Sequence, residues 1–353
     1  MPTSNHKPAS RGASANPANR FERLSCEPDP ECAEEDAPLL RTQFFKDGTK
    51  SIIARNDSPD VGFGASINAY RGCEHGCIYC YARPNHEYLG FSAGLDFESK
   101  IMVKERAPEL LRKELMSPRW KPEVIAMSGV TDCYQPGERK FRITRKCLEV
   151  LLEFRNPVGI ITKNHLVTRD IDLLGEMAKH QLVSVSISIT TLDEKLRKVM
   201  EPRASPPQSR LSAIRALSAA GVPVGVMTAP MIPGLNDHEM PEILAAAAEA
   251  GATHAGFVPV RLPHGVAPLF EQWLEEHFPG SKEKILSRIR DMRGGKLNDP
   301  NFGSRMQGQG VWAEQMATLF EAGCRKAGIA GGFPRLSTAG FRRPGEQMEL
   351  ELF

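Results

Sequence analysis

The sequence lacks any apolar run that approaches the roughly 20 residues needed to span a membrane. It also lacks a large excess of charge, because 45 basic and 43 acidic residues leave a formal net charge of +2. This balance neither supports nor excludes nucleic acid as a partner, so a phosphate-binding surface would have to be a local patch. Residues 1–20 have no apolar core of the kind found in signal peptides, and we therefore expect a cytoplasmic protein.

Cysteine is scarce, with eight in 353 residues, but three fall close together in Cys73-Glu-His-Gly-Cys77-Ile-Tyr-Cys80. Three thiolates on one short loop can hold a soft metal or an iron–sulfur centre. They leave the fourth coordination position without a cysteine, and metal-based catalysis requires such an open position. Zinc held by these cysteines and by His75 or His86 is the main alternative, since a CxxC pair also occurs in zinc sites.

Short β-branched segments alternate with helical patterns from residue 65 onward. We predict strands at 65–70, 123–129, 158–162, 182–190, 223–229 and 253–259, and helices near 107–116, 142–154, 169–180, 208–220 and 237–250. This alternation indicates parallel βαβ units with right-handed crossovers. It fits either an open doubly wound sheet or a complete or partial barrel, in which functional residues follow the C-terminal ends of the strands.

The composition divides the chain into four parts. Residues 1–60 are polar and contain several prolines, which predicts a disordered or loosely attached leader. Residues 61–264 form the predicted barrel, and residues 265–327 form a predicted helical extension that covers it. Residues 328–353 are predicted to form a flexible tail, because this stretch begins with many glycines and prolines.

The spacing of the three cysteines, with Tyr79 directly before the last, resembles the signature of radical S-adenosylmethionine (radical SAM) enzymes. The resemblance implies that Cys73, Cys77 and Cys80 bind three irons of a 4Fe–4S cluster, whose fourth iron binds SAM. It also implies a partial (βα)6 barrel, which agrees with the six predicted strands. The reduced cluster would pass one electron to SAM, and the resulting 5′-deoxyadenosyl radical would remove a hydrogen atom from a substrate. An electron donor of the flavodoxin or ferredoxin type is then an expected partner.

The same resemblance assigns cofactor contacts near the first two strands. It places Tyr79 near the adenine of SAM, with a lid over the cluster as a compatible role. It also implies that the backbone carbonyls of Ser128 and Gly129, after the second strand, receive the ammonium group of SAM.

Other predicted cofactor contacts follow from the chemistry of residues at strand ends. Lys163 follows the third strand, where an ammonium group can neutralise the SAM carboxylate. Ser186 and Ser188 alternate along the fourth strand and so face the lumen together, where ribose or the SAM carboxylate would partner their hydroxyl groups. Arg203, which comes later, can form a bidentate contact to a carboxylate or phosphate.

Over residues 60 to 260 the chain resembles one branch of the superfamily, that of spore photoproduct lyase, a DNA repair enzyme, and its relatives. The lyase uses a cysteine after the second strand to return a hydrogen atom. Cys133 lies in this loop but a few residues further along, so we expect a relative with its own substrate. We predict that Cys133 and Tyr134 lie near the substrate and quench or relay a radical, because both give up hydrogen atoms more easily than aliphatic carbons.

The sequence ends in Gln347-Met-Glu-Leu350-Glu-Leu352-Phe353. This peptide resembles the one by which bacterial polymerases and repair proteins bind the DNA sliding clamp, with a methionine at position 348 where leucine is usual. Leu350, Leu352 and Phe353 would enter an apolar cleft, while Gln347 fixes the register. The clamp, and DNA itself, are therefore predicted partners.

Together these patterns favour a radical SAM enzyme that removes a hydrogen atom from an unidentified substrate, with a nucleic-acid lesion as one candidate. One alternative is a non-catalytic zinc or iron–sulfur protein. Another is a radical SAM enzyme that modifies a protein or RNA, because SAM-binding residues say little about the substrate.

Overall fold

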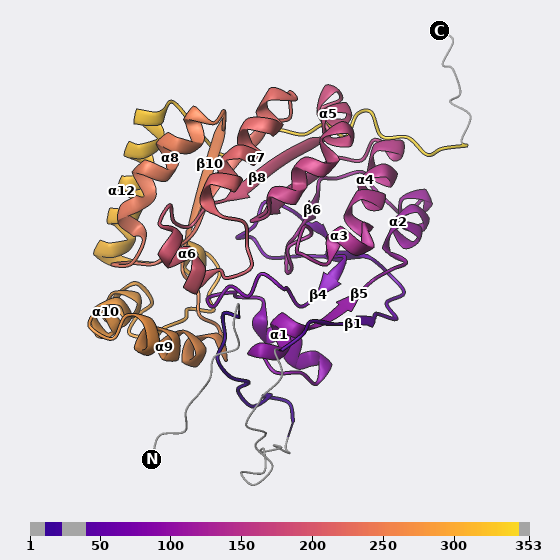
Figure 1. Ribbon diagram of the computed structural model, residues 1–353. Helices are drawn as coiled ribbons and strands as arrows, with labels where there is room; N and C mark the ends of the chain where they lie inside the picture. The colour runs from indigo at the N-terminus through magenta and orange to yellow at the C-terminus, as the bar shows by residue number, and fades with distance from the viewer. Residues whose placement is uncertain (1–10, 23–39, 346–353) are drawn as a thin grey trace.

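The computed structural model describes residues 11–22 and 40–345 of the chain. Its centre is an eight-stranded sheet in the order β11-β10-β9-β8-β7-β6-β3-β2 (Figure 1). Only β2 runs antiparallel to its neighbour, and the other paired strands are parallel. The strands are β2 (Ile53–Arg55), β3 (Ala65–Ile67), β6 (Ile125–Met127), β7 (Val158–Thr162), β8 (Val183–Ser188), β9 (Val224–Met231), β10 (His254–Pro259) and β11 (Ala330–Gly331).

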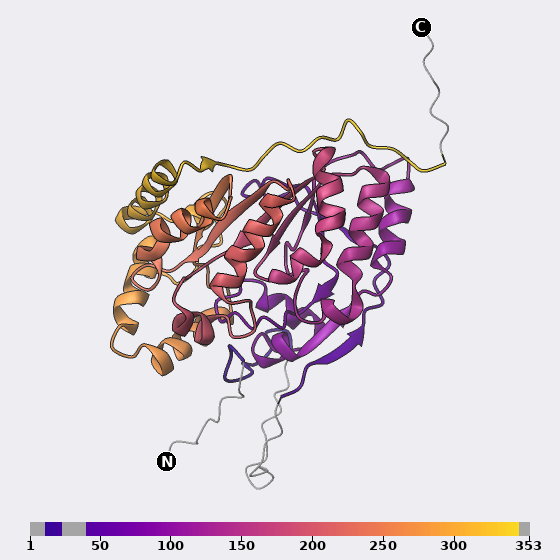
Figure 2. The ribbon, with the colours of Figure 1, turned by 45° about the horizontal axis from the view of Figure 1, so that its top comes forward.

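Helices pack along the outer face of this curved sheet, as Figure 2 shows. They follow the strands in turn: α2 (Ala107–Met116), α4 (Ile143–Phe154), α5 (Ile171–Lys179), α7 (Pro207–Ala219), α8 (Met240–Glu249) and α12 (Gly310–Ala327). Strands β3, β6, β7, β8, β9 and β10 with these six helices confirm the predicted partial (βα)6 barrel. Within the described residues, no helix is both long and apolar enough to cross a membrane.

Helix α4 illustrates why these segments fold as they do. Its residues Cys147, Leu148, Leu151 and Phe154 recur at helical spacing and are fully buried against the sheet. The helix ends at Arg155, which adopts a left-handed conformation with φ of 52°. Cys147 is therefore a small residue of the core.

A small second sheet combines one strand that precedes the barrel with two strands that lie between β3 and β6 in sequence. It consists of β1 (Gln43–Lys46), β5 (Lys100–Val103) and β4 (Tyr70–Arg71), with β5 in the middle. The segment from β4 to β5 also contains η2 (Arg83–Leu89) and α1 (Leu95–Ser99). The prediction of a loosely attached leader is therefore wrong for residues 40–60, because β1 pairs with β5 and β2 pairs with β3.

The predicted helical extension begins with α9 (Val266–His277) and α10 (Lys282–Met292), followed by the short α11 (Ser304–Gln307) and by α12. Apolar residues of α9 and α10 share a core with Cys77, Ile78 and Tyr79. Trp273 of α9 also donates a hydrogen bond to the carbonyl oxygen of Val199, at 3.0 Å. The extension therefore covers the loop that carries the three cysteines.

The C-terminal stretch up to residue 345 is held on the body of the molecule, so the prediction of a flexible tail is wrong for that part. It runs across the ends of α5, α4 and α2, as the yellow segment in Figure 2 shows. The backbone of Ser337 donates to Gln181, and that of Arg342 to Phe154. The guanidinium group of Arg343 donates to the carbonyl oxygens that end α2, which satisfies acceptors that a helix terminus leaves open.

Candidate active site

The three cysteines lie on a loop, residues 73–80, that follows β3 and β4 at the C-terminal end of the barrel strands. The thiols of Cys77 and Cys80 lie close enough to that of Cys73 to raise its pKa, and burial, the largest cause, raises the pKa of all three. The backbone amide of Asp132, from the loop after β6, donates toward the Cys73 thiol. A cluster bound to these buried thiols would hold them in the ionised form.

The donor set fits an iron–sulfur cluster better than a single metal ion. Among the described residues, no three His, Cys, Asp or Glu side chains converge on a point where one ion could be held. Zinc needs such convergence, whereas a 4Fe–4S cluster takes each thiolate on a different iron. His75, one proposed zinc ligand, has both ring nitrogens engaged, with Asn164 at 3.2 Å and Asp132 at 3.4 Å.

An N-terminal strap, residues 11–20, covers the cysteine loop from outside. The backbone amides of Gly12 and Ala13 both donate to the carboxylate of Glu98, each at 2.9 Å. Glu98 is fully buried and also pairs with Arg83, whose guanidinium group holds the carbonyl oxygen of Cys77. The prediction of a loosely attached leader is thus wrong for this segment too, because a buried carboxylate binds it.

Gly12 packs so closely on the loop that a larger residue would displace the strap. A Cβ at this position would lie 1.7 Å from the carbonyl oxygen of Gly76. We expect Gly12→Val to lose the two hydrogen bonds to Glu98, each worth about 1.5–3 kcal/mol because the acceptor is charged. Its cluster absorbance should bleach faster in the presence of a chelator.

Gly48→Val is the matched control, since a Cβ at Gly48 meets no atom within 4 Å. Equal bleaching rates for the two variants would show that the strap does not protect the cluster.

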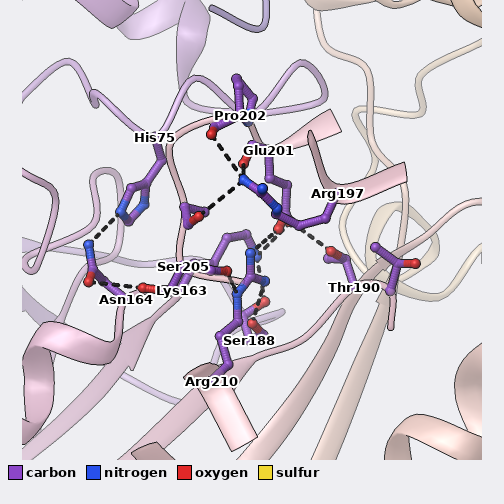
Figure 3. Close-up of polar contacts among 12 residues, drawn as sticks. His75, Lys163, Asn164, Ser188, Thr190, Arg197, Glu201, Pro202, Ser205 and Arg210 are labelled. Atoms are coloured by element: carbon purple, nitrogen blue, oxygen red, sulfur yellow. Dashed lines mark hydrogen bonds and ion pairs between the residues drawn. The ribbon is translucent and has the colours of Figure 1, made fainter. Parts of the chain in front are cut away.

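A buried polar network joins the cysteine loop to the ends of β7 and β8 (Figure 3). At its centre, the carboxylate of Glu201 accepts hydrogen bonds from Tyr79, Thr190 and Arg210. Lys163 extends from the end of β7, with its ammonium group 3.8 Å from Glu201 and 5.9 Å from the centre of the Tyr79 ring. We call the residues Tyr79, Lys163, Ser188, Thr190, Glu201 and Arg210 the Glu201 network.

The electrostatics of this network favour a negative ligand near the cysteines. Burial opposes ionisation of Glu201, but Arg210, Lys163 and the hydrogen bonds together lower the pKa of its carboxyl group to about 2. The positive charge of Lys163 also acts on Cys77 and Cys80, where it opposes the rise in thiol pKa. The Lys163 ammonium group therefore acts electrostatically on two of the three cysteines that the sequence identifies.

The sequence model of the radical SAM superfamily matches residues 67–247, which include the cysteine loop and most of the barrel. The chain belongs to the radical SAM superfamily. It is therefore a radical SAM enzyme that uses a 4Fe–4S cluster and SAM, and the non-catalytic zinc alternative is set aside. The three cysteines are the soft donors that such a cluster requires.

Curated relatives and solved structures resemble the chain over much of its length. An uncharacterized protein of Mycobacterium tuberculosis is 36% identical over 243 residues, which are 68% of this chain and 70% of that protein. One of Methanocaldococcus jannaschii is 32% identical over 173 residues, or 49% of this chain and 62% of that protein. A spore photoproduct lyase variant with bound AdoMet and dinucleoside spore photoproduct superposes with a TM-score of 0.58 at 16% identity, covering 82% of this chain and 80% of that one. That likeness shows a shared fold.

Protein groups already bind several of the residues that we predicted to contact SAM in this radical SAM enzyme. Ser188 accepts a hydrogen bond from Lys163, and Ser186 is buried on the same strand. Ser128 has a positive φ of 84°, and its hydroxyl group accepts the backbone amide of Cys133 at 2.9 Å. The carbonyl oxygen of Gly129 accepts the Tyr81 hydroxyl group at 2.6 Å.

Arg203 lies apart from the Glu201 network. Its guanidinium group binds the carboxylate of Glu74 at 3.0 Å and the hydroxyl group of Thr42 at 3.1 Å. Both partners come from segments far away in the sequence, and the ion pair already supplies the carboxylate that we expected from a cofactor. The Arg203 guanidinium group is thus engaged by protein partners.

Cys133 and Tyr134, predicted near the substrate, are both in the hydrophobic core. The Cys133 side chain is only 2% exposed, and burial raises the pKa of its thiol well above the usual value. Tyr134 is fully buried, and its hydroxyl group donates to Asp170 at 3.1 Å. The geometry therefore gives no support to a radical-relay role, because both side chains are buried in the core.

We expect Cys133→Ala to keep the cluster, SAM cleavage and the product distribution. The buried thiol would be lost from the core, which should lower the free energy of unfolding by about 1–2 kcal/mol. Urea unfolding and single-turnover product analysis on the same preparation would measure both effects. A variant that cleaves SAM normally but forms no product would show that the thiol takes part in the reaction.

The fold also brings to this site several residues that carry little signal in the sequence. Glu201 and Arg210, which form a buried ion pair, are the clearest example of such residues. Arg210 lies on α7, whose sequence mixes polar and apolar residues and so does not indicate which side chains are buried. Tyr81 and Arg261, from the loops after Cys80 and after β10, also meet, with the guanidinium carbon 5.8 Å from the ring centre. The sequence signal for Arg261 is its position just beyond the end of strand β10.

The predicted clamp-binding residues Gln347, Leu350, Leu352 and Phe353 lie outside the described residues. Clamp binding, DNA binding and an electron donor therefore stay predictions.

Proposed function

We propose that this radical SAM enzyme holds its cluster on Cys73, Cys77 and Cys80 and binds SAM between the cysteine loop and the Glu201 network. The observation that carries this proposal is the place of the Lys163 ammonium group at the end of β7, 3.8 Å from Glu201 and 5.9 Å from the centre of the Tyr79 ring. The bound cluster and SAM supply the radical that removes a hydrogen atom from the substrate. The protein's own residues bind, orient and exclude water.

The described residues have distinct roles in this proposal. Lys163 neutralises the SAM carboxylate, and its position is fixed by Ser188 and by the carbonyl oxygen of Ala229, at 3.1 Å. Glu201 accepts the Tyr79 hydroxyl group, which fixes the aromatic ring between two cluster ligands. Helices α9 and α10 pack over the loop and keep water from its apolar side.

A nucleic-acid lesion is the substrate that we propose. It is supported by the fold shared with spore photoproduct lyase, whose structures contain a dinucleoside spore photoproduct. The core position of Cys133 argues against hydrogen return by that thiol, so we propose a reaction different from that of the lyase. Modification of a protein or RNA is the alternative.

Deuterium transfer tests this proposal directly. Anaerobic, reconstituted enzyme would be mixed with SAM, a chemical reductant and deuterated DNA that carries defined lesions. Mass spectrometry of 5′-deoxyadenosine would then show whether deuterium has entered it. SAM cleavage with deuterium only from labelled protein or RNA would reject the DNA substrate, and no SAM cleavage with a full cluster would reject the enzyme mechanism.

A further inference from the structure

A cavity of about 370 Å³ lies against the cysteine loop, next to Gly72, the residue before Cys73. Its walls come from β4, η2, α1 and the loops that follow β3, β5 and β6. None of the residues that line it belongs to the Glu201 network. The cavity is therefore a second space near the chemistry, of a size that small-molecule sites have.

One wall of the cavity carries positive charge that the protein does not neutralise. Lys104 lies partly buried there and makes no side-chain hydrogen bond or ion pair with any described residue. Burial and the neighbouring Arg71 lower the pKa of its ammonium group. Asp47, a carboxylate that acts on Lys104, is already bound by Arg71 at 2.8 Å. A bound anion would remove the cost of holding these two cations together.

Amide groups add hydrogen-bond donors beside the two cations. The carboxamide oxygen of Asn68 accepts the backbone amides of Val130 and Thr131, at 2.8 and 3.3 Å. This arrangement fixes the Asn68 side chain with its NH₂ group unused. Asn68 thus links the cavity to the loop after β6, the loop that also contains Ser128 and Gly129.

Aromatic side chains form another part of the lining. Tyr88 and Phe97 line the cavity, and Tyr88 is 70% exposed. Phe21 stacks on Tyr88 with ring centres 4.8 Å apart, which holds the exposed ring in place. A flat ring can stack on such a platform, and every nucleobase has a face that suits it.

We propose that this cavity binds a nucleotide unit, with its phosphate at Lys104 and Arg71 and its base against the aromatic wall. The proposal deepens the proposed function and rests on it, because it assigns the nucleotide to the substrate. A free mononucleotide and a nucleotide within a strand offer the same chemistry here. An anion alone would leave the aromatic wall unused, and a purely apolar ligand would leave Lys104 without a partner.

The test is binding of a fluorescein-labelled single-stranded 12-mer to reconstituted enzyme, followed by fluorescence anisotropy, with AMP, dTMP and inorganic phosphate as competitors. We expect Lys104→Ala and Tyr88→Ala each to weaken binding by about tenfold, since stacking and a phosphate contact are of this order. Lys104→Arg should bind like the wild type. Lys113→Ala, which removes an exposed lysine of α2 outside the cavity, is the charge-matched control.

The competitors identify the source of the nucleotide. Competition by AMP or dTMP, stronger than by phosphate, supports the site and indicates a free nucleotide, while Lys104-dependent binding of the 12-mer alone supports it and indicates a strand. Equal competition by phosphate and nucleotides, no binding by the wild type, or equal loss in Lys104→Ala and Lys113→Ala would overturn it. Cluster absorbance and SAM cleavage in the same samples show whether a failure belongs to this site or to the proposed enzyme activity.

Discussion

Cys73→Ala protein is expected to fold but to lack the 4Fe–4S absorbance and to cleave no SAM. The variant keeps only two of the three thiols that share one loop, and two thiolates leave one corner of the cluster without a ligand. SAM cleavage should fall by at least about a thousandfold, to the background of the assay, because each electron passes through the cluster. Iron and sulfide analysis, absorbance spectra and 5′-deoxyadenosine formation on anaerobic protein would measure this.

Lys163→Ala is the matched control for that experiment, because it removes a proposed SAM contact and leaves all three cysteines in place. It should retain iron, sulfide and absorbance while SAM binding weakens by about tenfold or more. A full cluster and normal SAM cleavage in Cys73→Ala would remove Cys73 from the ligand set. Loss of the cluster in Lys163→Ala would instead give the lysine a structural role.

Local patterns in the sequence were sufficient for the alternating strands and helices and for the three cysteines, whereas the choice of a barrel depended on the resemblance to radical SAM enzymes. The predicted limits of α2 and β7 match the structure, because their apolar periodicity is local to each segment. The cysteine spacing and the place of Lys163 after β7 are also local signals. Each depends only on neighbours in the chain.

The parts that the sequence could not show depend on partners far away in the chain. Residues 40–60 read as polar and loose, yet β1 is ordered by pairing with Lys100–Val103. Arg203 reads as a free cation until the fold brings Glu74 to it. The segment containing Cys133 reads as a strand-end loop, and only the fold shows that this cysteine is buried in the core. Burial of charged or polar groups is set by tertiary contacts, so their roles could not be read from spacing.

The ion pair between Glu201 and Arg210 also depends on the fold, and it affects the stability of the protein. Both side chains are buried almost completely. Glutamate and arginine are rarely buried in proteins unless they are paired, so their residue types alone would not predict this burial. Arg210 also donates to the backbone carbonyls of Ser205 and Ser188, at 2.7 and 2.9 Å. The pair therefore joins α7, the end of β8 and, through Tyr79, the cysteine loop. An ion pair in this position fixes the relative placement of these three segments.

Glu201→Ala should accordingly lower the free energy of unfolding by about 3–5 kcal/mol at pH 7, because it leaves the buried Arg210 guanidinium group without its carboxylate. It should also weaken SAM binding, since Tyr79 and Lys163 lose a shared partner. Urea unfolding followed by tryptophan fluorescence would give the first effect. Replacing both residues by apolar ones, as in Glu201→Leu with Arg210→Met, should recover much of the stability because no unpaired charge remains.

The difference in the free energy of unfolding between the wild type and Glu201→Ala should also depend on pH, because folding lowers the pKa of Glu201. Folding depresses the pKa from its ordinary value of 4.5 to about 2, so the ionised carboxylate stabilises the folded state at any pH above 4.5. The advantage of the wild type over Glu201→Ala should be constant from pH 7 down to about 5 and should shrink as the pH falls toward about 2. A difference that stays the same at pH 3 and pH 7 would mean that the carboxylate charge does not stabilise the fold, and that Glu201 acts through hydrogen bonding and packing alone.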